Sequence, residues 1–316
     1  HKPSIMAGCS SPKAWKTGNE IAIDLYNSGD KEHPSFLIGP VGSGHFVKMV
    51  HNSIEYAVMQ MIAETITLFE NSIIDCFDWN DLATELSHSM VNSYLLDITK
   101  NNFHRIQKQK TDPVKRKKKR IPVDHNGTGV WALNYAHDNN ITMPSIARAV
   151  EHRLASTFFH SYITFKEEEL FSIKEKDKIS KGEFVKLLEL AIFSGFIQGL
   201  SCFSPTKDIF GEQIKIKHAL ILWNNRSVLR GDMIGYLLSL EGFSYSSGKL
   251  IVSSTAESFV NERLNSLSSS LKKIQNFSSL CPCLISGIGF FKYSENDDLI
   301  SKVLNVQRNV FGGHKE

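Results

Sequence analysis

Hydrophobic positions recur along the chain with two different periods. Near the start, two short apolar runs flank a segment whose apolar residues recur every three to four positions, which predicts a strand, helix, strand unit. From Gly44 onwards the pattern is helical almost without interruption, so we expect a mainly α protein. The expected elements are strands at 3–8 and 35–38 around a helix at 13–27, then helices at 45–70, 81–104, 145–170, 182–200, 215–240, 255–275 and 282–293, and a tail from about 296.

The first long helical segment contains an unusual polar stripe. Residues 42–56 read GSGHFVKMVHNSIEY, and most of their side chains are apolar. At about 100° per residue, five polar positions fall on one face of a helix. They are Lys48, His51, Asn52, Glu55 and Tyr56. Charged side chains enter such a buried helix only when they are paired or used, so this stripe is the first candidate site.

The spacing within the stripe suits a small ligand. Lys48 and Glu55 are seven residues apart, about 10 Å along the helix axis, which is too far for an i,i+4 ion pair. Gly42 and Gly44 precede the helix, where the first N–H groups would be free to receive an anion. Two interpretations remain: a site for a small polar molecule, or a buried polar network satisfied by neighbouring helices.

Composition narrows the function classes only slightly. With 316 residues, 41% of them hydrophobic, the chain is long enough for one large domain or two smaller ones. A net charge of +3 does not indicate nucleic acid and is compatible with an anionic substrate. Five cysteines, an odd number, favour the reducing cytoplasm. No uninterrupted apolar run is long enough for a membrane span, and the start reads as internal, without a signal peptide.

Two further motifs could in principle bind a partner or a metal. The basic run KRKKKR at 115–120 resembles a nucleic-acid patch, but it lacks interleaved aromatic residues, which favours a solvated loop and no nucleic-acid partner. The CPC motif at 281–283 lacks the second ligand pair of a structural zinc site. We therefore expect buried thiols there and no metal.

The residues described so far resemble the 6-phosphogluconate dehydrogenase family. The stretch at 42–56 is very similar to that family's GxGHFVKMVHNGIEY signature. Further segments follow in the family's order over essentially the whole chain. They are SIMAG near the start, DWN at 78–80, SYLLDIT at 93–99, GTGVW at 127–131, AVEHR at 149–153, IQG at 197–199, SVLR at 227–230 and QRNVFGGH at 307–314.

This resemblance implies a domain organisation. A large all-helical substrate and dimerisation domain would occupy 41–295. Residues 1–40 would be the end of an NADP-binding Rossmann-type domain, and 296–316 a tail that reaches the partner subunit of a homodimer.

The resemblance also implies NADP-dependent oxidative decarboxylation of 6-phospho-D-gluconate to ribulose 5-phosphate and CO2, in the pentose phosphate pathway. Lys48 would take the proton from the 3-hydroxyl while hydride passes to NADP, and Glu55 would protonate C1 of the enol left after CO2 departs. A lysine with a free-solution pKa of about 10.4 acts as a base only where burial or local charge lowers that value. Glu55 likewise needs surroundings that retain its proton near neutral pH.

Several residues match the family's substrate contacts. Tyr56 and Arg153 match groups on the phosphate, which suits the forked donors of a guanidinium. Arg308 and His314 match tail residues that enter the partner's active site. The complete implied set is His51, Asn52, Tyr56, Asn126, Thr128, Arg153, Arg308 and His314.

Three departures from the family matter. The G-x-G-x-x-G fingerprint is absent, so the chain should not bind NADP in the family's manner. Asn126 stands where the family has a phosphate-binding lysine, so phosphate affinity should fall. The sequence also stops two residues after His314. Two interpretations remain: part of a complete enzyme whose cofactor domain lies upstream, or a degenerate, inactive paralogue that dimerises or binds sugar phosphate without redox activity.

Overall fold

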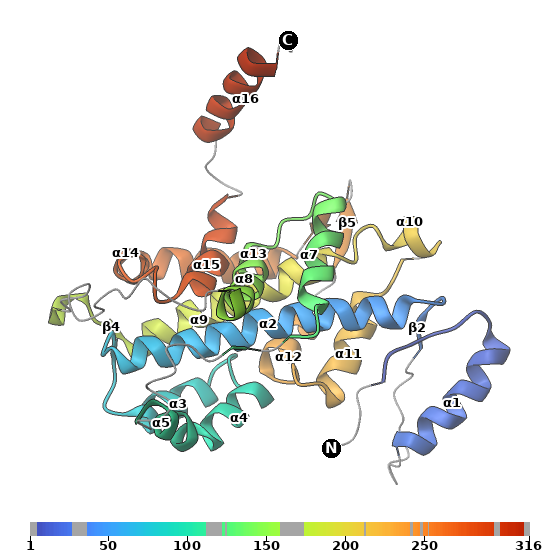
Figure 1. Cartoon of the computed structure of the whole chain (residues 1–316), viewed down its shortest axis with the longest axis horizontal. Helices are drawn as coiled ribbons and strands as arrows, with labels where there is room; N and C mark the ends of the chain where they lie inside the picture. The colour runs from blue at the N-terminus through green and yellow to red at the C-terminus, as the bar shows by residue number, and fades with distance from the viewer. Residues whose placement is uncertain are drawn as a thin grey trace.

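The protein is mainly α, as the hydrophobic pattern predicts. The computed structural model describes residues 5–26, 37–111, 122–123, 125–158, 174–211, 213–240, 243–246, 249–251, 253–293 and 298–312. Figure 1 shows the long helix α2 crossing the body, with shorter helices arranged around it. Within the described ranges, strands occur only as three short pairs.

The chain begins with the expected strand, helix, strand unit. Strand β1 (Ala7–Gly8) is followed by α1 (Pro12–Tyr26) and β2 (Leu37–Gly39), and the two strands pair in parallel. A parallel pair requires a crossover connection, which α1 provides. Proline suits the first position of a helix. The Ser11 hydroxyl, just before it, accepts a hydrogen bond from the Ala14 N–H.

The helical body follows. Its helices are α2 (Ser43–Glu70), α3 (Trp79–Ser87), α4 (Tyr94–Asn101), α5 (Phe103–Thr111), α7 (Thr128–Asp138), α8 (Pro144–Phe158), α9 (Lys181–Ser201), α10 (Thr206–Phe210), α11 (Ile216–Arg226), α12 (Asp232–Ser239), α13 (Ser254–Ser266), α14 (Ser268–Gln275), α15 (Pro282–Tyr293) and α16 (Asp298–Gly312), with a 3-10 turn at Glu175–Asp177. The other strands are the parallel pair β3 (Ile74–Asp75) and β4 (Ile179–Ser180) and the antiparallel pair β5 (Ser244–Ser246) and β6 (Lys249–Ile251).

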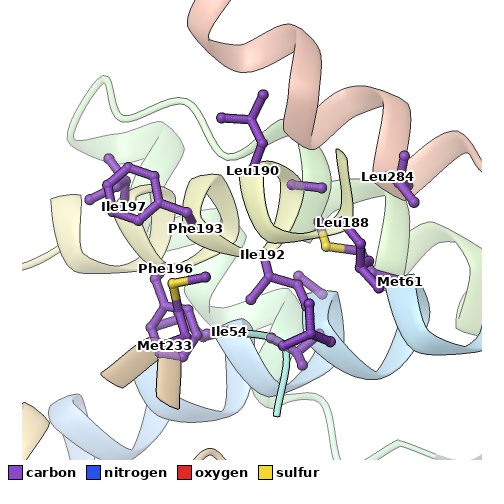
Figure 2. Close-up of a cluster of buried hydrophobic side chains, with 14 of the residues drawn as sticks. Ile54, Met61, Leu188, Leu190, Ile192, Phe193, Phe196, Ile197, Met233 and Leu284 are labelled. Carbon is purple, nitrogen blue, oxygen red and sulfur yellow. The ribbon is translucent and has the colours of Figure 1, made fainter. Parts of the chain in front are cut away.

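The core lies where α2, α8, α9 and α15 pack together. Figure 2 shows Ile54 and Met61 of α2 against a row of α9 side chains, with Leu284 of α15 nearby. Helix α9 approaches α2 closely because Gly199 has no side chain; a Cβ there would lie 2.3 Å from Ile54 Cγ1. Within the described residues, Lys181–Phe210 is long and apolar enough to cross a membrane, yet 94% of its most apolar window is buried inside the body. The apolar character of this segment is therefore explained by its place in the core.

A buried carboxylate joins α2 to α15. Glu64 is 3% exposed and accepts hydrogen bonds from the backbone N–H groups of Cys283 (3.1 Å) and Leu284 (2.9 Å). These are donors of the first turn of α15, which no intrahelical partner satisfies. Burial raises the pKa of Glu64, and the two backbone hydrogen bonds act against that rise. Glu64 thus joins the second half of α2 to the start of α15.

Three of the expected helices were wrong because each is interrupted. The segment 81–104 forms α3, α4 and α5, and the Ser93 hydroxyl caps α4 by accepting from the Leu96 N–H. The segment 215–240 is broken where Gly231 forms a β-bridge with Ser93, and 255–275 divides at Leu267. Capping and inter-helix bridges interrupt a helix without changing its apolar period.

Other elements were not anticipated. Helix α7 begins directly after Gly127, and the expected tail contains the helix α16. Helix α8 ends at Phe158, and the rest of the predicted 145–170 helix lies outside the described residues. The basic run at 115–120 also lies outside them. The proposed divisions at 40/41 and 295/296 fall between β2 and α2 and between α15 and α16, and they stay predictions.

Candidate active site

The polar residues predicted on one face of α2 form a connected network. Lys48 Nζ lies 3.2 Å from His51 Nδ1, which is 3.1 Å from Asn52 Oδ1 and 3.7 Å from Glu55 Oε2. Asn52 donates through Nδ2 to the hydroxyl of Thr128, at 3.3 Å, on the neighbouring helix α7. Because α2 supplies four of these five groups, their relative positions follow from helical geometry alone.

A cleft of about 440 Å³ opens beside this network. Its lining comes from the middle of α2, from the turn before α7 and from α8. The lining residues are Asn52, Glu55, Tyr56, Met59, His125, Asn126 and Arg153. The N-terminus of α2 is not part of this lining. It packs against the backbone near Met6 instead, so closely that a Cβ at Gly44 would lie 2.3 Å from the Met6 carbonyl oxygen. The stripe is therefore both a polar network and one wall of a cleft.

The turn before α7 shapes one side of the cleft. Gly127 adopts a left-handed φ of 82°, which glycine tolerates without strain. Asn126 Oδ1 accepts from the Thr128 hydroxyl (2.8 Å), the Thr128 N–H (3.3 Å) and the Tyr56 hydroxyl (3.4 Å). His125 Nδ1 accepts from the Gly127 N–H at 3.2 Å. Asn126 thus ties this turn to α2.

A buried guanidinium lies at the same end of the cleft. Arg153 is 6% exposed, and its guanidinium carbon lies 3.7 Å from the centre of the Tyr56 ring. Nη2 faces the Met59 sulfur at 3.8 Å, and Nη1 is buried without a hydrogen-bond partner among the described residues. Buried donors are rarely left unpaired, so this group is suited to an acceptor that a ligand would bring.

Burial sets the electrostatics of the network. It lowers the pKa of Lys48 below the usual lysine value, although the charge of Glu55 acts against this. Burial raises the pKa of Glu55, opposed by the charges of Lys48 and Arg153. The lysine is thereby closer to a usable base, and the glutamic acid closer to a usable proton donor, at neutral pH.

His51 is a neutral imidazole. Burial, reinforced by the charge of Lys48, lowers its pKa to about 3. Its Nδ1 either accepts from Lys48 or donates towards Asn52, depending on the tautomer, and its buried Nε2 has no hydrogen-bond partner among the described residues. The ring therefore makes its hydrogen bond to the network through Nδ1 alone and adds no charge.

Several residues implied by the resemblance do not line the cleft: Lys48, His51 and Thr128 lie beside it in the network. Arg308 is exposed on α16, which stands away from the body in Figure 1, and His314 lies outside the described residues. Conversely, His125 and Met59 line the cleft but were missed. A histidine two positions before Gly127, at a helix start, was the available signal for His125.

The cysteines take no part in this site. Cys281 and Cys283 are buried at the start of α15, and burial raises the pKa of both thiols. Across the described ranges, no group of three or more His, Cys, Asp or Glu side chains is arranged to hold a metal ion.

A half-buried lysine and a carboxyl group beside a cleft with an unpaired guanidinium define a protein suited to acid–base chemistry on a small anion. The family profile described as 6-phosphogluconate dehydrogenase, C-terminal domain, matches residues 44–315. The chain therefore belongs to the 6-phosphogluconate dehydrogenase family.

Its relatives are decarboxylating 6-phosphogluconate dehydrogenases. The enzyme of Buchnera aphidicola is 28% identical to this chain. The enzyme of Bacillus subtilis, which is NAD(+)-dependent, is 22% identical. Each alignment covers 99% of this chain and 67% of the relative. The chain thus spans about two thirds of their length. The Plasmodium falciparum enzyme, solved as apo form and with NADP+ and 6-phosphogluconate, is 21% identical with a TM-score of 0.72, covering 97% of this chain and 67% of that one. This likeness shows the shared fold.

Replacing Glu55 by glutamine should lower the pKa of Lys48 further. The negative charge of Glu55 stabilises the ammonium form of Lys48, so its removal leaves burial unopposed. Titrating the lysine 13Cε signals by NMR would measure this shift. Glu85→Gln, on α3, is the matched control and should leave the Lys48 titration unchanged. A Lys48 titration that moves to higher pH in Glu55→Gln would contradict the coupling.

Proposed function

We propose that this chain is the substrate-binding and dimerisation part of an NADP-dependent, decarboxylating 6-phosphogluconate dehydrogenase. The complete enzyme would convert 6-phospho-D-gluconate to ribulose 5-phosphate and CO2. The observation that supports this most directly is that Lys48 and Glu55 lie on one face of α2, each in contact with His51, beside a cleft that ends at the unpaired Nη1 of Arg153. A sugar acid with a phosphate at its far end has the charge pattern that this cleft fits.

Lys48 and Glu55 have complementary proton-transfer roles in this proposal. Lys48, with its lowered pKa, takes the proton from the substrate's 3-hydroxyl. Decarboxylation of the resulting β-keto acid places electrons on an enol, whose C1 must be protonated. Glu55, with its raised pKa, supplies that proton. Asn52 lines the cleft and would contact the substrate, and His51, which is buried behind it, is the second substrate contact that we propose.

The turn before α7 and helix α8 would bind the phosphate. Arg153 brings the buried positive charge, and Tyr56, Asn126 and Thr128 bring polar groups around it. Asparagine contributes a donor and no charge, so this end has one cation fewer than the resemblance implies.

NADP is the proposed hydride acceptor. A nicotinamide, when bound, accepts the hydride from the carbon that bears the 3-hydroxyl. The residues described before α2 form only the β1, α1, β2 unit, and the 316-residue sequence has no G-x-G-x-x-G turn for a pyrophosphate. These residues do not fit a dinucleotide on their own. The choice between NADP and NAD therefore depends on groups outside them.

We further propose a cytoplasmic homodimer. Helix α16 stands away from its own body and exposes Val303, Leu304 and Val306, which suits packing against a second subunit. In that arrangement Arg308 and His314 enter the partner's cleft. The described cysteines are all free, as expected of a reducing compartment.

The inactive paralogue is the second candidate. Asn126 in place of a lysine favours it, because the phosphate end has lost a charge. Such a protein would bind sugar phosphate but form no NADPH when combined with a nicotinamide-binding domain, whereas the enzyme would form it.

Calorimetric titration of the chain with 6-phosphogluconate and with gluconate tests the substrate. We expect the phosphorylated ligand to bind more tightly by about tenfold or more, since charge-assisted hydrogen bonds to phosphate are absent from gluconate. Equal affinity for both ligands would overturn the proposed substrate.

A further inference from the structure

His125 lines the cleft next to Asn126, at the end where Arg153 is buried. Neither the hydrophobic pattern nor the family resemblance assigned it a role. We propose that His125 is a substrate-binding residue whose Nε2–H donates a hydrogen bond to the substrate's phosphate. This inference rests on the proposed function, because it concerns the phosphate of that substrate.

The local hydrogen bonding determines which ring nitrogen is available. His125 Nδ1 accepts from the Gly127 N–H at 3.2 Å, so its lone pair is engaged with the backbone. A neutral imidazole that accepts at Nδ1 holds its proton on Nε2. The half-buried ring therefore has one donor left, on the nitrogen that the turn does not use.

Few other donors of the cleft are uncommitted. Asn52 already donates to Thr128, and the Tyr56 hydroxyl donates to Asn126. Glu55 is an acceptor when ionised, and a thioether has no donor to offer. Among the lining residues, Arg153 Nη1, the Asn126 amide nitrogen and His125 Nε2 remain, together with the second N–H of the Asn52 amide.

These remaining donors suit one ligand group. A phosphate offers three terminal oxygens, each able to accept more than one hydrogen bond, and a lone guanidinium does not satisfy them all. The start of α7, an 11-residue helix without a side-chain cap, adds its positive end on the same side. The nine-tenths buried, unpaired Arg153 Nη1 independently marks this end as an anion position. His125 thereby adds a neutral donor at the end of the cleft where Asn126 provides no charge.

Two substitutions separate the roles of the two ring nitrogens. In His125→Asn, the amide oxygen replaces Nδ1 as acceptor for the N–H two residues on, a normal Asx-turn, but no donor reaches the cleft. In His125→Gln, the amide nitrogen takes the place of Nε2 and keeps the donor. Circular dichroism and thermal melting of each variant establish that it is folded.

The measurement is calorimetric titration of the full chain with 6-phosphogluconate and with gluconate. We expect His125→Asn to bind 6-phosphogluconate about tenfold more weakly than the unmodified chain, and His125→Gln to keep most of the affinity. The affinity for gluconate should be the same in all three proteins, because it has no phosphate.

The outcomes separate this inference from the proposed function. If the unmodified chain prefers 6-phosphogluconate and His125→Asn keeps that preference in full, the role of His125 is overturned alone. If His125→Asn loses affinity for gluconate to the same extent, the histidine acts on the turn and not on the phosphate, which also overturns it. If the unmodified chain shows no preference, the proposed substrate is overturned together with this role.

Discussion

Replacing Lys48 by methionine should reduce NADPH formation by about 10²- to 10⁴-fold in an enzyme that combines this chain with a nicotinamide-binding domain. Methionine matches the length of the lysine stem and suits the partly buried position on α2, so the helix should form normally. Methionine has no group that accepts a proton. Hydride transfer from the substrate's carbon requires that the 3-hydroxyl lose its proton, so this step should slow. Single-turnover absorbance of NADPH at saturating substrate measures the step directly.

Lys48→Arg separates proton removal from charge. Arginine keeps the positive charge but stays protonated at any physiological pH, so it serves as a cation and not as a base. We expect both variants to lose NADPH formation while their oligomeric mass stays the same. NADPH formation within a few-fold of the unmodified enzyme in either variant would remove Lys48 from the base role.

Replacing Arg153 by leucine should weaken binding of 6-phosphogluconate by about 10²-fold, because a buried charge that faces a phosphate is lost. Leucine keeps apolar contact with the Tyr56 ring, over which the guanidinium lies at 3.7 Å. The affinity for gluconate should change little, and this difference identifies the phosphate as the lost partner. Calorimetric titration of both ligands measures the effect.

Arg148→Leu is the matched control on the same helix. Arg148 is 56% exposed and pairs with Glu151 at 3.0 Å on the surface of α8. An exposed pair of this kind contributes little, so its loss should leave both affinities unchanged. The phosphate role of Arg153 fails if its leucine variant binds 6-phosphogluconate as tightly as the Arg148 variant does.

The α2 stripe was predictable from the sequence because it lies within one helix. Helical period alone places Lys48, His51 and Glu55 on one face, and the observed contacts among them agree. Arg153 and Thr128 are far from α2 in the sequence. Residue spacing therefore does not predict their contacts with Tyr56 and Asn52. Only the family resemblance pointed to them, and the packing of α7 and α8 on α2 places them there.

The elements that were missed have physical reasons of their own. The apolar period passes through Ser93 and Leu267 without a change, so the breaks there depend on caps and on a bridge to a distant glycine. His125 was missed because its role depends on the turn geometry at Gly127, and no periodicity encodes it. The side chains that join elements were thus harder to predict than those within an element.

The hydrogen bonding of Asn126 has an evolutionary consequence. Its carbonyl oxygen is the common acceptor for Thr128 and Tyr56, which a lysine side chain does not replace. A lysine at this position would add a charge to the cleft and leave these two donors without their acceptor. Residue 126 is therefore epistatic with both neighbours, and a lysine is best accommodated together with changes at those two positions.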